Sequence, residues 1–538
     1  MKARIILMRH SKVLLQLICA LLSAILLFSV CIAAMAADAQ EAVSENDPSP
    51  IIYVIGRTPI YSKLGTAEEK ETPDAERSEI IDAVKEALPY LAKAILLGQW
   101  DAYADKAYDL IMPFFEDFGL DQTGGVNNGS GVKFTWQESS LSKDYKSNNP
   151  YTYHFEYDSR LSPLEIADDL NDYIEAVKRV TGKDKVSLIG RCLGANVALS
   201  YVSKYQRPQQ YAGLDSFVFY DQSVSGIEVL ETAFSGSVKI DPTAAGVFLG
   251  EFAISTGNET LDKIIPLTFT MLRDTYGIEI TAKRIQNIYD HIRDTAILRF
   301  IKSTFGSCPG YWSMVKDGYE QAKNYIFGAD GDKETYKVLL DKIDAYREIV
   351  QLHCEDMIAE MQQSSVQVAA ICKYGFSAYP LSENAKYLSD GVTGLKKQSF
   401  GATVSETDAT LGAADLAAAD PAYLSPDKQV DGSTALLKDT TWYIKNYKHN
   451  SFWNSLHPLL CAICRVPGFD VSSDPNYPQF LMMESGGQYN VFPMTVENCD
   501  PDGAIVRDGD TPVKKTFFTR MRAILHYFAA VVKVLLGR

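Results

Sequence analysis

Apolar residues along this chain form short runs that alternate with stretches of helical periodicity. The runs at residues 50–61, 151–158, 186–189 and 214–221 have the length of strands buried in a parallel sheet. Between the second and third runs, one helix face carries Ile166, Leu170, Ile174 and Val177. The order strand–helix–strand–helix over residues 151–204 predicts an α/β fold with a mostly parallel central sheet and right-handed crossovers.

A long segment with few strand patterns interrupts this alternation. Residues 225–362 show helical patterns, and strand-type sequence returns only at residues 366–375. The last strand is predicted at residues 440–447. We expect the helical insertion to form a cap or lid over the sheet.

A sharp turn follows the strand predicted at residues 186–189. Gly190, Cys192 and Gly194 alternate with Arg and Leu, and a helical pattern begins directly afterwards at residues 197–204. Glycine is needed at these two positions for a steric reason: a strand and a helix can approach each other closely only where side chains are absent. The sequence therefore predicts strand, turn and helix with the Cys192 thiol at the apex.

This pattern, G-x-C-x-G, resembles the nucleophile elbow of the α/β-hydrolase family, with Cys in place of the usual Ser. The resemblance implies that an acid and then a His follow the nucleophile along the chain. His449 lies directly after the strand at 440–447 and is our choice of base, with His457 as the alternative. Asp390 lies in a loop after the strand at 366–375 and is our choice of acid, with Asp221 as the alternative.

Several segments together look like the lipase branch of the α/β-hydrolases, which includes lecithin:cholesterol acyltransferase-like enzymes. They are PIIYVIG, KVSLIGRCLGAN, SDGVTG and TTWYIKNYKHN, in that order. The resemblance implies ester hydrolysis or acyl transfer on lipidic substrates. It also implies an oxyanion hole formed by the N–H of Leu193 and that of Arg57 or Thr58, since Pro59 has no N–H.

These patterns divide the chain into five parts. We predict a signal peptide at 1–36, a hydrolase core at 49–224 and 363–512, a helical cap at 225–362, and a basic amphipathic helix at 513–538. The terminal helix carries an apolar stripe beside basic residues, a pattern that is typical of contact with a membrane surface and also of docking on a domain.

The thiol is a competent nucleophile when it is ionised, and a His partner and a helix N-terminus both favour ionisation. We therefore expect a Cys192–His449–Asp390 triad that cleaves acyl esters through a thioacyl intermediate. One alternative is a catalytically inactive hydrolase fold that binds lipid or another surface component. Another is an acyltransferase, in which an acceptor other than water takes the acyl group.

Charge and targeting patterns limit the partners and the location. The formal net charge of the 538-residue chain is −16 and the chain has no long basic run, which argues against nucleic acid as a partner. A basic start, an apolar stretch at residues 13–33 and the A-x-A site Ala34–Ala36 predict secretion, or membrane anchoring if the leader is not cleaved. No metal-ligand cluster or phosphate-binding glycine loop is recognisable, so we expect no metal and no cofactor.

Overall fold

The computed structural model describes most of the chain between residues 49 and 499. Gaps fall at 58–59, 74–76, 134–135, 142–151, 408, 450, 452–453 and 484–489. Between 252 and 276 only residues 263, 267, 268 and 271 are described, and after 499 only 521, 524–527, 530 and 531. The leader predicted at 1–36 and nearly all of the terminal helix predicted at 513–538 thus lie outside the described residues.

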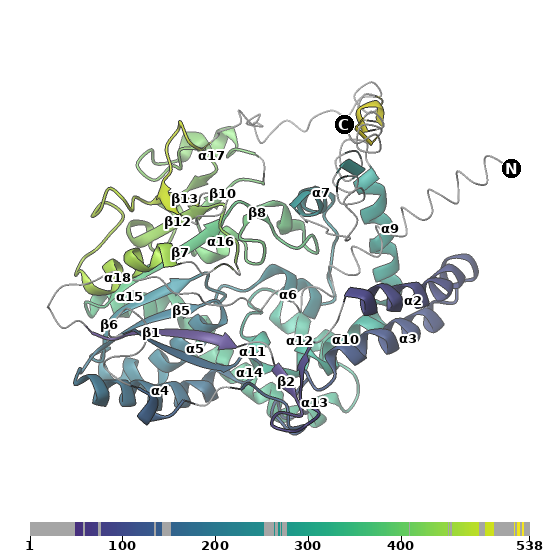
Figure 1. Cartoon of the computed structure of the whole chain (residues 1–538), viewed down its shortest axis with the longest axis horizontal. Coiled ribbons are helices and arrows are strands. Elements are labelled where there is room, and N and C mark those ends of the chain that lie inside the picture. The colour runs from purple at the N-terminus through teal and green to yellow at the C-terminus, as the bar shows by residue number, and fades with distance from the viewer. Residues whose placement is uncertain are drawn as a thin grey trace.

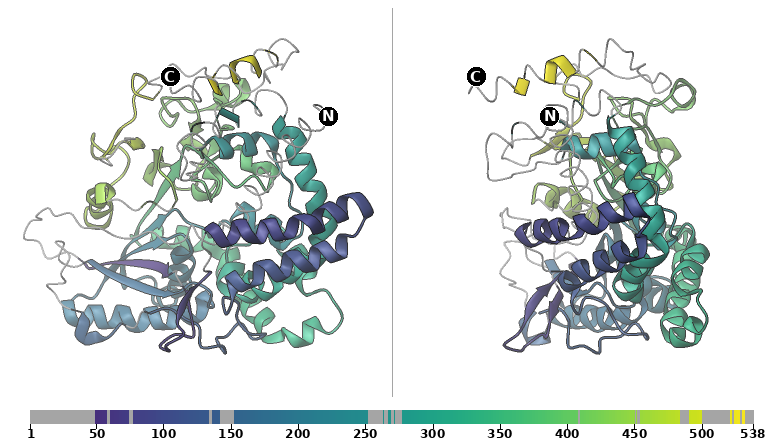
Figure 2. Two further views of the ribbon diagram at one scale, coloured as in Figure 1. Left: turned by 45° about the vertical axis from the view of Figure 1, so that its right-hand side comes forward. Right: turned by 90° about the vertical axis from the view of Figure 1, so that its right-hand side faces the viewer.

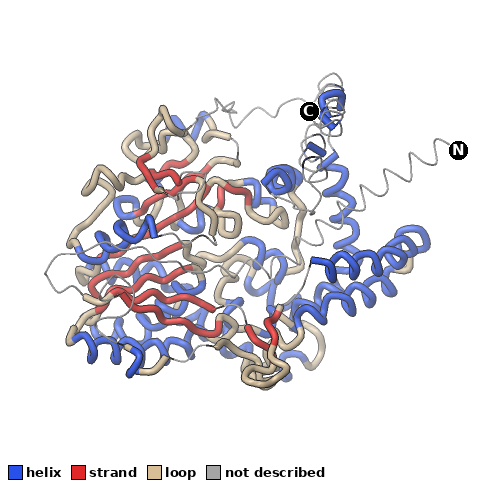
Figure 3. Tube along the Cα trace, in the orientation of Figure 1, coloured by secondary structure: helices blue, strands red, loops and turns tan. Residues whose placement is uncertain are grey.

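One eight-stranded sheet forms the centre of the molecule (Figures 1 and 3). Its order is β14-β13-β12-β7-β6-β5-β1-β4, and only β14 runs antiparallel to its neighbour. The strands are β1 (Ile51–Arg57), β4 (Thr152–Asp158), β5 (Val186–Arg191), β6 (Leu214–Tyr220), β7 (Gln367–Tyr374), β12 (Thr441–Lys445), β13 (Phe480–Met483) and β14 (Val491–Pro493).

Side chains of the central strands alternate between two apolar cores, because successive residues of a strand point to opposite faces. In β5, Leu188 packs in the core that includes helices α4 (Pro163–Thr181), α5 (Leu193–Tyr201) and α15 (Cys354–Gln363). Its neighbour Ile189 packs in the core that includes α18 (His457–Arg465). Helices therefore cover both faces of a mostly parallel sheet, which confirms the predicted α/β-hydrolase fold.

The described residues between β6 and β7 form helices. They include α6 (Glu228–Phe234), α7 (Pro242–Glu251), α9 (Gly277–Ile292), α10 (Leu298–Ser303), α11 (Pro309–Trp312), α12 (Tyr319–Phe327) and α14 (Lys337–Ile349). Most of these helices share a third apolar core at one end of the sheet, whereas α15 packs directly against β7. The helix pair α2 (Arg77–Leu97) and α3 (Trp100–Ile111) packs on α9 and projects away from the sheet (Figure 2).

One strand prediction needs correction. The strand predicted at 440–447 is β12, but it is not the last strand, because β13 and β14 extend the sheet beyond it. The run Phe480–Met483 has only four apolar residues, and periodicity cannot distinguish so short a run from part of a buried helix.

The membrane-related predictions are not decided by the described part of the chain. Among the described residues, no helix is both long enough and apolar enough to cross a bilayer. In the tail, the described residues 521, 524–527, 530 and 531 are helical, and Met521 and Leu525 are exposed.

Helix α5 lies unusually close to β1 and β5 because of two glycines. A Cβ atom on Gly194 would lie 1.8 Å from the carbonyl oxygen of Val54 in β1. A Cβ atom on Gly190 would lie 2.5 Å from the Cα atom of Ala195. In both places the obstacle is backbone, which cannot rotate away as a side chain can. The two glycines are thus required for the β5–α5 turn.

We therefore expect Gly194→Ala to force α5 away from β1 and to lower the free energy of unfolding by about 3 kcal/mol, as overpacking does in tight cores. Gly131→Ala is the matched control, since its Cβ would meet only the tip of the Leu64 side chain, at 3.3 Å. Urea denaturation followed by circular dichroism measures both variants. Equal stability of the two would contradict the close contact.

Candidate active site

Cys192 occupies the apex of the β5–α5 turn in a strained backbone conformation. Its φ is 48° and its ψ is −121°, a region that residues with a side chain rarely adopt. The turn is held by the Cys192 N–H, which donates to the carbonyl of Tyr220 at 2.9 Å. Cys192 is the N-cap residue of α5 and is half-buried. Its thiol is thus presented at the end of the sheet beside the positive end of a helix.

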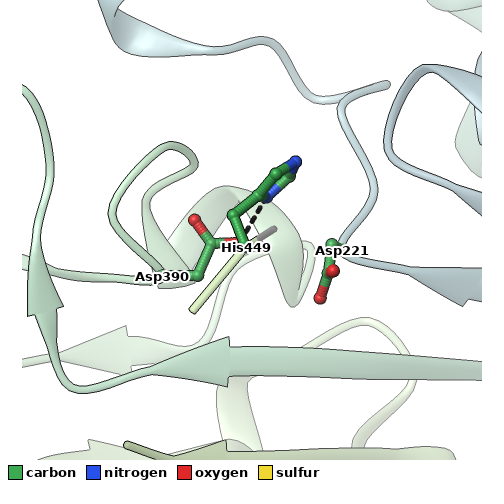
Figure 4. Close-up of side chains that lie close together, drawn as sticks. All are labelled: Asp221, Asp390 and His449. Carbon is green, nitrogen blue, oxygen red and sulfur yellow. Dashed lines mark hydrogen bonds and ion pairs between the residues drawn. The ribbon is translucent and has the colours of Figure 1, made fainter. Parts of the chain in front are cut away.

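His449 and Asp390 form a buried pair next to this turn (Figure 4). His449 Nδ1 donates to Asp390 Oδ2 at 2.7 Å, and the His449 backbone N–H donates to the Asp390 carbonyl at 2.9 Å. The second carboxylate oxygen of Asp390 accepts the N–H groups of Val392 and Thr393, at 2.9 and 2.8 Å. These bonds fix the orientation of the carboxylate and leave His449 Nε2 for another partner.

The Cys192 side chain is close enough to His449 to raise the pKa of the imidazole, and both residues line the same pocket. Burial lowers the pKa of His449, but the negative charge of Asp390, the Cys192 side chain and the hydrogen bonds to both outweigh it. The pKa of His449 therefore lies well above 6.5, its ordinary value. This shift favours the protonated imidazole, which can stabilise a thiolate. The structure thus brings together the three residues that the sequence analysis selected.

Asp221, the alternative acid, has a different partner. Its Oδ2 lies 2.6 Å from Nζ of Lys373, and both side chains are fully buried. The ligand atoms of Asp221, Asp390 and His449 all lie within 4.8 Å of one another, and Figure 4 shows the three side chains. The Lys373 ammonium and the Asp390–His449 hydrogen bond already engage these atoms, so the donor set does not fit a metal ion.

An apolar pocket of about 130 Å³ opens next to Cys192 and His449. Core strands and loops contribute part of its lining, namely Ile55, Gly56, Ser159, Arg191, Cys192, Leu193, Tyr379, Val392 and His449. The helical segment predicted as a cap contributes the rest, namely Ile227, Leu230, Tyr311 and Met314. The helices between β6 and β7 thus supply part of the wall of the space in which a substrate of Cys192 would lie.

The predicted oxyanion donors are only partly described. Leu193 is the first residue of α5, where N–H groups have no acceptor within the helix, and it lines the pocket. Arg57 ends β1, whereas Thr58 lies outside the described residues. The neighbouring Ile55 and Gly56 reach the pocket. The end of β1 therefore forms part of the pocket wall.

The alternative base, His457, lies elsewhere. It begins α18, where its Nδ1 lies 3.1 Å from the Tyr53 hydroxyl and its Nε2 lies 3.3 Å from Sγ of Cys461. Burial first, and the nearby Arg465 second, lower the pKa of His457 to about 4. The structure does not bring His457 together with Cys192.

Sequence reasoning did not predict that two cations, Arg191 and Lys373, contact the His449 loop. Arg191 donates from its guanidinium to the His449 carbonyl at 3.1 Å. Lys373 donates to the carbonyl of Ser451 at 2.7 Å, besides its ion pair with Asp221. One signal for Lys373 was available, since a lysine inside a buried strand needs an ionic partner. Its partner could not be identified from the sequence.

Comparisons with known proteins give little further information. No family model matches the chain, and no curated protein matches it. One solved structure with similarity is meta-cleavage product hydrolase from Pseudomonas fluorescens IP01, complexed with acetates. The identity is 10% over 38% of this chain and 53% of that one, with a TM-score of 0.14. The chain thus spans about half the length of that enzyme.

The pairing of Cys192 with His449 makes a prediction for thiol reactivity. Because the pKa of His449 is raised, its positive charge is present at pH 6.5 and is lost only as the pH rises through that higher value. We expect His449→Ala to slow the alkylation of Cys192 by iodoacetamide at pH 6.5 at least tenfold. Peptide mass spectrometry measures the rate, with the half-buried Cys461 as an internal control. Equal rates in both proteins would contradict the pairing.

Proposed function

We propose that this protein is a cysteine-dependent hydrolase of carboxylic esters. One observation carries the proposal: the thiol at the strained β5–α5 turn lines one apolar pocket together with a histidine that is hydrogen bonded to a buried carboxylate. An inactive binding protein needs a pocket but has no chemical need for a thiol beside a histidine–carboxylate pair.

The reaction proceeds in two steps. In the first, Sγ of Cys192 attacks the ester carbonyl carbon and forms a thioester, while the bond to the alkoxide oxygen breaks. The proton on His449 Nε2 passes to the departing alkoxide, which leaves as an alcohol. In the second step, His449 takes a proton from water and the resulting hydroxide attacks the thioester carbon. The carboxylic acid is released, and the Cys192 thiolate is regenerated beside the protonated His449. Asp390 keeps Nδ1 protonated throughout.

The oxyanion of each tetrahedral intermediate needs hydrogen-bond donors. We assign one to the N–H of Leu193, which lies at the N-terminus of α5. The other is assigned to the loop after β1, at Arg57 or Thr58. Removal of one such donor typically costs a factor of about 10² to 10³ in kcat.

The pocket supports a limited acyl size. A cavity of about 150 Å³ in another protein interior holds benzene, which has six carbon atoms. The pocket beside Cys192 has about 130 Å³. We therefore propose that the acyl part of the substrate contains about six carbon atoms or fewer, and that apolar contacts with Leu230 and Met314 hold it. The resemblance to lipases implies lipidic substrates but does not indicate the length of their acyl chain.

We also propose that the protein is secreted. The basic start, the apolar stretch and the A-x-A site support secretion through a cleaved leader. The basic amphipathic tail supports contact with a membrane surface. An acyltransferase would share the first step, and replacement of water by an alcohol in the second step distinguishes it from a hydrolase.

The test is hydrolysis of p-nitrophenyl esters with acyl chains of two to twelve carbons, under reducing conditions. We expect activity with a maximum at or below about six carbons, and a loss of at least a thousandfold in Cys192→Ala, because no nucleophile remains. Cys461→Ala, which removes another half-buried thiol, is the matched control and should retain full activity. Activity that survives in Cys192→Ala would refute the assignment.

A further inference from the structure

We infer that Lys373 is a positioning residue for the proposed reaction: it ties the His449 loop to the sheet and reserves Asp390 as the partner of the imidazole. This inference rests on the proposed function, and it assigns a role to a buried charge that the two chemical steps do not use. The structure offers four observations for it: the burial of Lys373, its acceptors, its aromatic neighbours, and the second carboxylate beside His449.

The Lys373 ammonium has acceptors on two parts of the active site. Lys373 lies in β7 and its side chain is fully buried. Its Nζ donates to Asp221 Oδ2 at 2.6 Å and to the Ser451 carbonyl at 2.7 Å, and the His449 carbonyl lies at 3.4 Å. An ammonium group has three protons, so these three oxygens match its donor capacity.

Two aromatic rings enclose the same group. The Nζ atom lies 4.5 Å from the centre of the Tyr220 ring and 4.3 Å from that of Tyr447. Both tyrosines are fully buried. Such contacts stabilise a cation that has lost its water. The site is therefore built to hold a positive charge.

The loop that carries His449 depends on this anchor. It leaves the sheet at the end of β12, and its described residues 446–449 and 451 belong to no helix or strand. The backbone N–H of His449 is fixed by the Asp390 carbonyl, while the carbonyls of His449 and Ser451 are fixed by cations from the sheet. The imidazole must be held within about 0.5 Å of a productive position. Loss of Lys373 removes the anchor on one side of this loop.

Lys373 also decides which carboxylate acts on His449. Ligand atoms of Asp221 and Asp390 both lie within 4.8 Å of those of His449, so either carboxylate is close enough to attract the imidazole. The ion pair with Lys373 neutralises Asp221, and Asp390 alone remains for His449. The charged and titratable groups that face Lys373 are Asp221, Asp390, Arg191, His449 and the two tyrosine hydroxyls.

A purely structural ion pair would predict a different outcome when Lys373 is replaced. It would lower stability and leave turnover of the folded enzyme unchanged. The chain offers a matched control for this in Lys445 of the neighbouring strand β12. Its Nζ lies 2.7 Å from Asp427 Oδ2 in a largely buried pair. Among the described residues its other acceptor is Gln429 Oε1, at 3.0 Å, so this pair does not include the His449 loop.

The experiment compares Lys373→Met, Lys445→Met and the double variant Asp221→Asn/Lys373→Met in steady-state ester hydrolysis. We expect Lys373→Met to lower kcat at least 50-fold with KM within twofold of the wild type, because the acyl pocket is untouched. Lys445→Met should keep kcat within threefold. The double variant leaves no unpaired buried charge, so it folds even if Lys373→Met does not. Its kcat should remain at least 20-fold low, because the Ser451 carbonyl still lacks its donor.

The result that would overturn the inference is a kcat of the double variant within threefold of the wild type, or an equal loss in Lys445→Met. Failure of the proposed function is a separate outcome, because it would show as absence of hydrolysis by the wild type. In that case the inference is tested through Cys192 alkylation at pH 6.5. The rate should fall at least fivefold in the double variant relative to the wild type and not in Lys445→Met, and equal rates would refute it.

Discussion

The close approach of helix α5 to strand β1 is the constraint on which the rest of the site depends. Gly194 permits this contact because its missing Cβ leaves room for the Val54 carbonyl oxygen. The contact forces the chain to reverse direction within one residue, and that residue, Cys192, takes the strained conformation. Strain of this kind costs about 1–3 kcal/mol and persists only where the surrounding packing enforces it. The sheet and α5 supply that packing, and the result is a thiol at a helix N-terminus.

Balanced charge is the second requirement of the site. Three ionisable side chains with almost no exposure, Asp221, Asp390 and Lys373, lie around His449. Burial of any one alone would be costly, because isolated ions lose their hydration in the interior. Each has a partner at 2.6 or 2.7 Å instead. Burial raises the pKa of Asp221 and lowers that of Lys373 to about 8, while each opposes the shift of the other. The arrangement leaves the imidazole with one carboxylate partner.

The sequence predicts those parts of the site that depend on neighbouring residues. It does not predict those that depend on contacts between residues far apart in the chain. The turn around Cys192 follows from two glycines between a buried strand and a helix, and His449 and Asp390 follow from their order after strands. Lys373 is different: it lies within the apolar run at 366–375, and nothing in that run indicates which distant residues it contacts. The pocket wall is likewise assembled from residues such as Leu230 and Val392, which are far apart in the chain.

The central claim is that Cys192 forms a covalent acyl intermediate. The most direct measurement is rapid mixing of the protein with p-nitrophenyl butyrate, acid quenching within milliseconds, and mass spectrometry of the intact chain and its peptides. The account predicts a butyryl group on Cys192 that is released by neutral hydroxylamine, as thioesters are. Turnover of the ester with no adduct on Cys192, or with an adduct on another residue, would contradict it.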